Sequence, residues 1–159
     1  MSLSIEIDLA AQSLTLLGAA DGERRYRVST SRHGVGELSG SFKTPRGRHV
    51  VRARIGAGAP VGTVFVGRRP TGEIYSPELA RRFPERDWIL TRILWLSGLE
   101  PGRNRLGSVD TMRRYIYIHG MPDGEPLGVP GSIGCIRMAN EDIVELFELV
   151  PAGTVVNIG

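Results

Sequence analysis

The chain contains a single cysteine, Cys135, which stands on a glycine-rich turn. His119 lies sixteen positions upstream, at the end of segment 114–118, whose alternating pattern is typical of a β-strand. A free thiol has a pKa of about 8.5 and is only a few per cent ionised at neutral pH. A neighbouring imidazole lowers that pKa, and a drop to about 6 is worth roughly 3.4 kcal/mol. The two residue types predict a cysteine nucleophile with a histidine base.

A structural role for Cys135 is the alternative, because single cysteines are among the most buried residue types and usually behave as small hydrophobes. Gly131 and Gly134 bracket the turn. Glycines suit tight turns and a close approach of the backbone to a substrate carbonyl. Backbone N–H groups in such a turn can also stabilise an oxyanion. The surroundings of Cys135 therefore favour the nucleophile.

Six segments carry a further pattern. They are Ile-His-Gly at 118–120, Leu-Gly-Val-Pro at 127–130, Ser-Ile-Gly-Cys-Ile-Arg-Met at 132–138, Ser-Phe-Lys-Thr-Pro-Arg-Gly at 41–47, Asn-Glu-Asp at 140–142 and Gly-Thr-Val-Val-Asn-Ile at 153–158. Together they resemble the YkuD-type L,D-transpeptidase catalytic domains. Segment 119–138 is the specific part. One departure is Ile133, which stands where the family commonly has a histidine before the Gly-Cys pair.

The resemblance implies roles for eight residues. It implies a catalytic group of Cys135, His119 and the backbone carbonyl of Gly120, which orients the imidazole. It places oxyanion donors around Ile133 and Gly134. Substrate-binding side chains are then expected at Arg137, Ser132 and Tyr117.

The residues themselves leave alternatives for the substrate-binding positions. Arg137 either forms a structural ion pair or binds a substrate carboxylate, which a planar guanidinium grips with two hydrogen bonds. Ser132 either caps the turn or donates a hydrogen bond near the imidazole. Tyr117 faces away from Ile116 and Ile118, and it either lines the cleft or is half buried.

The activity implied by the resemblance is acyl transfer on the tetrapeptide stems of peptidoglycan, without a cofactor. Cys135 would release the terminal D-alanine, and an amine would resolve the thioester into a 3→3 cross-link. Covalent inhibition by carbapenems and a periplasmic or cell-envelope location follow from the same resemblance. One alternative is an L,D-carboxypeptidase or amidase, in which water resolves the thioester. Another is a non-catalytic cell-wall-binding module, which Ile133 favours.

The length predicts a single domain over residues 1–159. The composition, with 41% hydrophobic and 23% charged residues, is that of an ordinary globular protein. No run approaches the ~18 apolar residues of a membrane span. No signal peptide is visible at the start of the sequence, so a cytoplasmic location stays open. The net charge is +3, but the arginines are scattered and aromatic residues make up only 6%, which argues against nucleic-acid binding.

The fold is expected to be mainly β, a β-rich α+β domain built as a sandwich or partly closed barrel with one substantial C-terminal helix. Alternation and turn residues predict antiparallel strands at 5–9, 12–17, 25–29, 49–55 and 90–96. The helix is expected to begin at Asn140 as its N-cap and to end before Pro151, behind the catalytic turn. Its apolar stripe is Ile143, Val144, Leu146, Phe147 and Val150.

Proline and glycine break segment 67–110 into short pieces, so its flanks are expected to be long loops. We expect 75–87 to form a flap over the site. Segment 34–40 has the glycines of a hairpin turn and lacks dinucleotide-loop spacing. His33 and His49 match no zinc-site spacing with His119 and Cys135, so we expect no metal.

Overall fold

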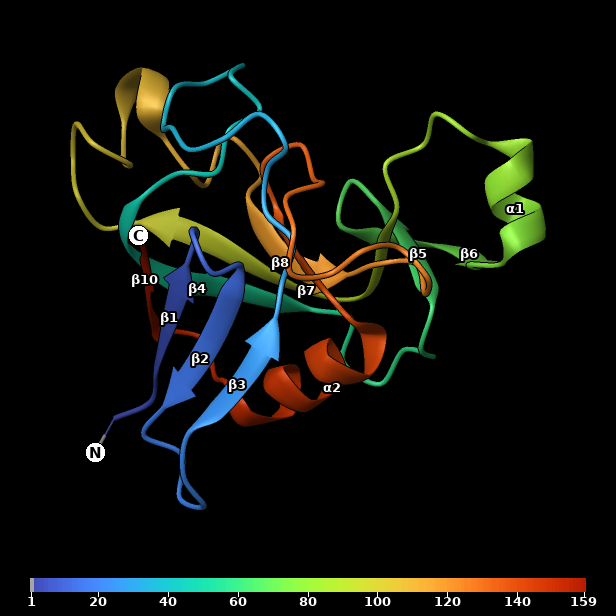
Figure 1. Cartoon of the computed structure of the whole chain (residues 1–159), viewed down its shortest axis with the longest axis horizontal. Coiled ribbons are helices and arrows are strands. Elements are labelled where there is room, and N and C mark those ends of the chain that lie inside the picture. The colour runs from blue at the N-terminus through green and yellow to red at the C-terminus, as the bar shows by residue number, and fades with distance from the viewer. Residues whose placement is uncertain (1) are drawn as a thin grey trace.

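The structure is a computed structural model that describes residues 2–159, and its main element is one curled sheet of ten strands (Figure 1). The strands are β1 (Ser4–Asp8), β2 (Ser13–Leu17), β3 (Arg24–Arg27), β4 (Gly47–Ile55), β5 (Thr63–Val66), β6 (Arg69–Ile74), β7 (Ile89–Gly98), β8 (Tyr117–Gly120), β9 (Ile136–Met138) and β10 (Val155–Ile158). The helices are α1 (Pro77–Arg82), α2 (Asn140–Leu149) and a 3₁₀ turn, Gly107–Val109.

The sheet follows the order β3-β2-β1-β10-β4-β7-β5-β6, and β8 branches from β7 to pair with β9. Most neighbours are antiparallel, as the alternating pattern predicted. Two pairs are parallel, β1 with β10 and β8 with β9. The alternation of a strand reports which face is buried but not the direction of its neighbour, so sequence reasoning missed both pairs.

Five of the six predicted strand segments are confirmed, as β1, β2, β3, β4 and β7. The sixth, 114–118, was wrong at its start, because residues 114 and 115 lie in a turn and β8 begins only at Tyr117. Segment 34–40 is not a hairpin, because it forms turns with one isolated bridge between Val35 and Thr44. The expectation of loops on both flanks of β7 was wrong for β6 and α1. The mostly exposed β6 shows no alternation of burial, and Ser76 caps α1 by accepting the N–H of Leu79 at 3.0 Å.

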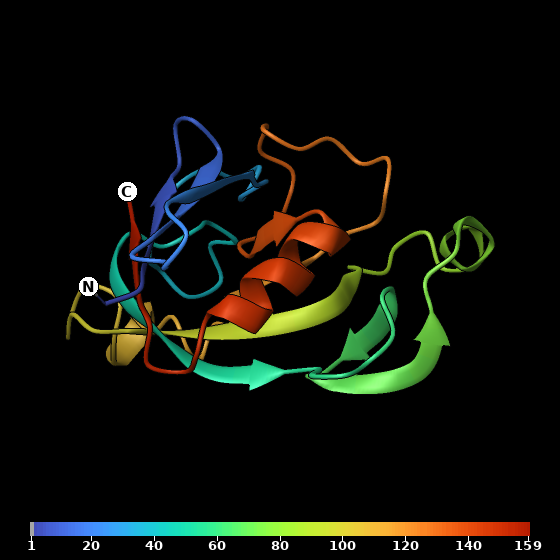
Figure 2. The same ribbon diagram turned by 90° about the horizontal axis from the view of Figure 1, so that it is seen from below.

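Helix α2 covers one face of the sheet and lies across β7 in Figure 2. Ile143, Leu146 and Phe147 of the helix are buried in one core cluster with Ile118 and Ile136 of β8 and β9. The helix therefore supports the β8–β9 pair from the face opposite to the candidate site, as predicted from the sequence.

The prediction that Asn140 caps α2 was wrong. The N-cap position is Ala139, and Asn140 is the first helical residue. Its side chain points into the protein, where its amide donates to the carbonyl of Met121 at 2.9 Å and accepts from the hydroxyl of Thr91 at 2.5 Å. Buried partners on β7 and just after β8 thus replace the local cap interaction.

Candidate active site

The parallel pairing of β8 with β9 brings the two candidate catalytic residues together. Ile118 lies opposite Ile136, and His119 opposite Arg137. One residue before this ladder, the N–H of Tyr117 donates to Sγ of Cys135 at 3.3 Å. Because residues two apart on a strand share a face, Cys135 and His119 lie on the same side of the sheet, away from α2. In the described part of the chain no hydrogen bond joins Sγ directly to the imidazole.

Two backbone groups hold the sulfur of Cys135. Tyr117 donates to it, and the thiol donates to the carbonyl of Tyr115 at 3.4 Å. Burial raises the pKa of the Cys135 thiol to about 12, although the N–H of Tyr117 and the cations Arg114 and Arg137 act against that rise. The cysteine of the free protein is therefore a thiol, which is opposite to the lowered pKa expected from the sequence.

His119 is held in one tautomer. Its Nδ1 lies 2.6 Å from the carbonyl oxygen of Gly120, so Nδ1 carries the proton and Nε2 carries the lone pair. The residue is 1% exposed, and burial lowers the pKa of its imidazole. The charge of Asp87 and the bond to Gly120 oppose that shift, and Arg137 adds to it. A neutral imidazole with a free Nε2 is the protonation state of a general base.

The turn before Cys135 is fixed by Ser132. Its hydroxyl donates to the carbonyl of Cys135 at 2.6 Å and accepts the N–H of Gly134 at 3.2 Å. Ser132 therefore caps the turn, one of its two predicted roles. Thr44 adds a bond from its hydroxyl to the carbonyl of Gly134 at 3.0 Å. Within residues 2–159 the N–H groups of Ile133 and Cys135 have no acceptor, whereas that of Gly134 is engaged.

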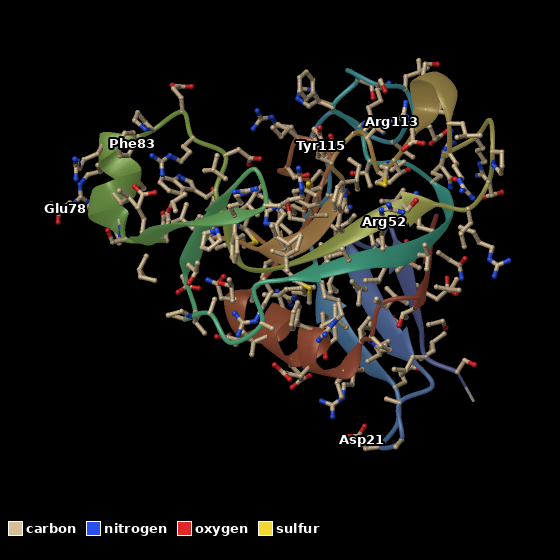
Figure 3. All side chains as sticks on the ribbon, turned by 180° about the vertical axis from the view of Figure 1, so that it is seen from behind. Asp21, Arg52, Glu78, Phe83, Arg113 and Tyr115 are labelled. Atoms are coloured by element: carbon tan, nitrogen blue, oxygen red, sulfur yellow. The ribbon has the colours of Figure 1, made fainter. Side chains whose placement is uncertain are left out.

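A cleft of about 620 Å³ opens beside this turn. Ser132, Ile133 and Arg137 line one wall, and residues of the predicted flap segment 75–87 line the other. Figure 3 shows that Glu78 of α1 and Phe83, which follows the helix, lie well apart from Tyr115. Other residues of this segment, among them Tyr75 and Asp87, line the cleft. Its charged lining is Arg32, Arg81, Glu85, Arg86, Asp87, Glu125 and Arg137.

Arg137 is anchored at the back of the cleft. Its guanidinium donates to the hydroxyl of Ser29 at 3.1 Å and lies 3.4 Å from the carboxylate of Glu125. A side chain at Gly131 would collide with it, since a Cβ there would lie 2.4 Å from Nη2 of Arg137. Its buried Nε has no partner among the described residues. Because Arg137 also lines the cleft, its guanidinium can meet an anion there.

The side chain of Tyr117 is buried and does not line the cleft. Its ring is buried with Phe65 and Ile93, and its hydroxyl accepts from Arg68 at 2.9 Å. It contacts the site through its backbone N–H instead. Arg68 also stacks on Trp95 and Tyr115, at 4.6 and 4.8 Å from their ring centres.

Sequence reasoning missed several contributors to the site. The carbonyl of Tyr115 and the side chain of Asn140 gave no signal, because a backbone acceptor has no residue signature and asparagine before a helix indicates a cap. Thr44 lay in a segment singled out for its resemblance, and Asp87 ended the predicted flap. The sequence indicated the segments that contain Thr44 and Asp87, but not that Thr44 binds the carbonyl of Gly134 or that Asp87 acts on His119.

No hydrogen bond in residues 2–159 joins either of the other two histidines to Cys135 or His119. Both ring nitrogens of His49 have partners, the carbonyl of Gly47 at 3.0 Å and the hydroxyl of Thr111 at 2.9 Å. The ring of His33 packs against Phe42. Residues 2–159 include no cluster of three or more His, Cys, Asp or Glu suited to a metal ion. None of the helices described here has the length and apolarity needed to span a membrane.

Comparison with known proteins places these features in a family. The sequence model of the YkuD L,D-transpeptidase catalytic domain matches residues 2–158. A curated relative, the putative L,D-transpeptidase YkuD of Bacillus subtilis (strain 168), is 44% identical over 46 residues. That alignment covers 29% of this chain and 28% of the relative.

Solved structures share the fold. An L,D-transpeptidase from Mycobacterium smegmatis superposes with a TM-score of 0.58 at 18% identity, over 99% of this chain and 58% of that one. L,D-transpeptidase 3 from Mycobacterium tuberculosis, in complex with a faropenem-derived adduct, gives 0.59 at 16% identity, over 99% and 60%. The chain thus spans about three fifths of these relatives.

Proposed function

The chain belongs to the YkuD family of L,D-transpeptidase catalytic domains, and we propose that it is a cysteine-dependent L,D-transpeptidase acting on the tetrapeptide stems of peptidoglycan. The observation that carries the proposal is the state of His119. A neutral imidazole, with Nδ1–H on the carbonyl of Gly120 and Nε2 free, lies on the same face as a thiol. A thiol beside such a base is the arrangement that acyl transfer through a thioester requires.

In the first step, Sγ of Cys135 attacks the carbonyl carbon of the third stem residue while Nε2 of His119 takes the thiol proton. The tetrahedral oxyanion is stabilised by the N–H groups of Ile133 and Cys135, which have no acceptor within the described chain. The N–H of Gly134 contributes by holding Ser132 rather than the oxyanion. Collapse breaks the amide bond, and His119 returns the proton to the amine of the departing D-alanine.

The raised pKa of the Cys135 thiol fits a proton transfer that occurs together with attack. Burial raises that pKa, and in the free protein the thiol donates to the carbonyl of Tyr115, a bond that only the neutral form can make. A substrate in the cleft brings its carbonyl to the sulfur, and the S–H then turns from Tyr115 to His119. The thiolate forms only when an electrophile is present.

In the second step an amine from another stem attacks the thioester, His119 accepts its proton, and a 3→3 cross-link forms as the thiol is released. Arg137, which lines the cleft, is the proposed contact for a substrate carboxylate. The proposed substrate places the reaction in the cell envelope.

Two alternatives use the same site. If water resolves the thioester, the enzyme is an L,D-carboxypeptidase or amidase, and the open cleft beside Ile133 favours water access. If no thioester forms, the chain is a cell-wall-binding module, which the partly exposed Ile133 in place of the usual histidine favours.

Covalent inhibition by carbapenems is part of the proposal. When Cys135 attacks the carbonyl of a β-lactam, the ring opens and the inhibitor stays attached as a thioester. The faropenem-derived adduct of the Mycobacterium tuberculosis relative supports this expectation. Incubation with imipenem should add the intact mass of the inhibitor to the wild-type protein and nothing to Cys135→Ala.

The test is mass spectrometry of the products formed from a disaccharide-tetrapeptide by the wild-type protein and by Cys135→Ala. Release of D-alanine that depends on Cys135 supports acyl transfer. A cross-linked dimer then assigns a transpeptidase, and a free tripeptide assigns a carboxypeptidase. The absence of both release and acyl-enzyme would refute the enzymatic proposal and favour the binding module.

A further inference from the structure

A buried chain of hydrogen bonds ends at the carbonyl of Met121, the residue that follows Gly120. The N–H of Gly62 donates to the hydroxyl of Thr91 at 3.1 Å, and that hydroxyl donates to Oδ1 of Asn140 at 2.5 Å. The amide of Asn140 then donates to the carbonyl of Met121 at 2.9 Å. Thr91 is 0% exposed and Asn140 7% exposed. Buried polar groups are costly unless they are paired, so this chain is a defined structural feature.

Thr91 occupies an unusual backbone conformation within this chain. Its φ is +76°, a region that β-branched residues rarely enter. It lies where the pairing of β7 with β8 shifts register between Leu90 and Ile93. Such conformations persist only when the surrounding contacts hold them, and they cluster at functional sites. The bonds of Thr91 to Gly62 and Asn140 are contacts of this kind.

Asn140 also encloses the peptide of Gly120. A Cβ on Gly120 would lie 2.4 Å from Oδ1 of Asn140 and 2.7 Å from the carbonyl oxygen of Leu90. Gly120 is therefore packed between the asparagine amide and β7, with the next carbonyl, Met121, bonded to the same amide. The carbonyl of Gly120 accepts Nδ1–H of His119.

We propose that Asn140, held by Thr91, is a positioning residue that fixes the Gly120 carbonyl and thereby keeps His119 in its Nδ1–H tautomer. This goes beyond the roles assigned to Cys135, His119 and Gly120. Its kinetic consequence rests on the proposed function, but its effect on the tautomer does not. Without the brace the Gly120 peptide can rotate, and the proton then distributes between the two ring nitrogens.

The charged groups facing His119 remain the same when Asn140 is replaced. They are Asp87, from the segment before β7, and Arg137 on β9, with the thiol of Cys135 on the same face. Asp123 lies 3.4 Å from the amide of Asn140 and loses a weak contact. A change in His119 therefore reports on the Gly120 carbonyl.

The chain contains a matched control, Asn104. It is 0% exposed, and its amide donates to the carbonyls of Arg46 and Arg48 at 3.0 Å each. These flank Gly47, whose carbonyl holds Nδ1 of His49. Asn104→Ala and Asn140→Ala thus remove the same buried side chain beside two different Gly–His pairs.

The experiment is ¹⁵N NMR of the ring nitrogens of the three histidines in the free protein. Asn140→Ala should move the His119 nitrogens from the Nδ1–H pattern toward the averaged shifts of two tautomers and leave His49 unchanged. Asn104→Ala should leave His119 unchanged. A His119 spectrum identical in wild type and Asn140→Ala would overturn the proposal.

The kinetic readout is kcat for D-alanine release. It should fall about 10- to 100-fold in Asn140→Ala with little change in KM, the size of effect seen when a residue that orients a metal-binding histidine is removed. Because the bond to Gly120 raises the pKa of His119, the acidic limb of its pH–rate profile should move to lower pH. Equal kcat losses in Asn104→Ala and Asn140→Ala would contradict a positioning role. An inactive wild-type protein would refute the proposed function while the NMR result still decides the brace.

If Asn140→Ala fails to fold, the hydroxyl of Thr91 provides the second test. Thr91→Val keeps the shape and removes the bond to Asn140, whereas Thr91→Ser keeps the hydroxyl. Thr91→Val should shift the His119 nitrogens, and Thr91→Ser should restore the wild-type spectrum. The same spectrum for both variants would count against the proposal.

Discussion

The surroundings of His119 and His49 use one arrangement for two purposes. Both imidazoles are buried, and each donates Nδ1–H to a glycine carbonyl, Gly120 in one case and Gly47 in the other. Each glycine is packed against a buried asparagine, so that a Cβ on either one would collide with the amide. Burial lowers the pKa of both imidazoles, that of His49 to about 4.

The two sites differ at the second ring nitrogen. Nε2 of His49 accepts a hydrogen bond from the hydroxyl of Thr111, so both nitrogens of this buried ring have partners. Nε2 of His119 has no partner in residues 2–159, and its face of the sheet carries Cys135. Burial and a fixed tautomer are therefore not sufficient to identify a base. The neighbour of the free nitrogen distinguishes the proposed base from a structural histidine.

Replacing the two histidines should separate them most strongly. His119→Gln should lower kcat for D-alanine release by about 10²- to 10⁴-fold, the usual contribution of a general base. His49→Gln should keep kcat within about threefold and lower the free energy of unfolding, because it disturbs a buried pair of hydrogen bonds. Steady-state assays and urea unfolding of both variants measure this. Comparable losses of kcat would remove the distinction between the two sites.

The pH dependence of stability should reveal His49. Its pKa is about 6.5 when unfolded and about 4 when folded, so its neutral form stabilises the fold fully above pH 6.5, and this contribution is lost as the pH falls toward 4. The wild type should lose about 3 kcal/mol more than His49→Gln between pH 7 and pH 4. Urea unfolding at both pH values tests this, and parallel losses in the two proteins would show that His49 does not titrate as a buried neutral ring.

Adding a methyl group to each glycine should sharpen the comparison further. In Gly120→Ala the new Cβ meets Asn140 and Leu90, so we expect kcat to fall about 10-fold or more, together with a loss of about 1–3 kcal/mol in stability. Gly47→Ala should also destabilise the protein, since its φ is +103° and its Cβ would meet Glu100. Under conditions in which Gly47→Ala is folded, its kcat should stay near the wild-type value. A normal kcat in Gly120→Ala would argue against orientation by this carbonyl.

The smallest effect is expected from Thr111→Val. It removes the partner of Nε2 of His49 and should cost about 1–2 kcal/mol, because a buried acceptor is left unpaired. The kcat for D-alanine release should be unchanged. Thermal or urea unfolding together with the assay measures both quantities. A fall in kcat would mean that the two histidine sites are coupled.

The fold was predictable where one face of an element is buried. The alternation at 5–9 and 49–55 predicted β1 and β4, and the apolar stripe after Asn140 predicted α2. The exposed β6 and the six-residue α1 have no such stripe, so their sequences resembled loops. The parallel β8–β9 pair, which creates the site, depends on contacts between distant segments and not on local pattern.

The candidate site was predictable in its residue types but not in its electrostatics. The spacing of Cys135 and His119 and the resemblance around them identified the pair. The raised pKa of the Cys135 thiol depends on burial and on the charge of Asp87, which the sequence does not display. The role of Asn140 was hidden because the same residue type suits a helix cap.

The central claim is that Cys135 forms a thioester with the help of His119. Intact-protein mass spectrometry after rapid mixing with the disaccharide-tetrapeptide tests it most directly, using wild type, His49→Gln, His119→Gln and Cys135→Ala. We expect an adduct of the stem lacking D-alanine on Cys135 in wild type and His49→Gln, much slower formation in His119→Gln and none in Cys135→Ala. An adduct that forms as fast in His119→Gln as in wild type, or no adduct in any of them, would contradict the account.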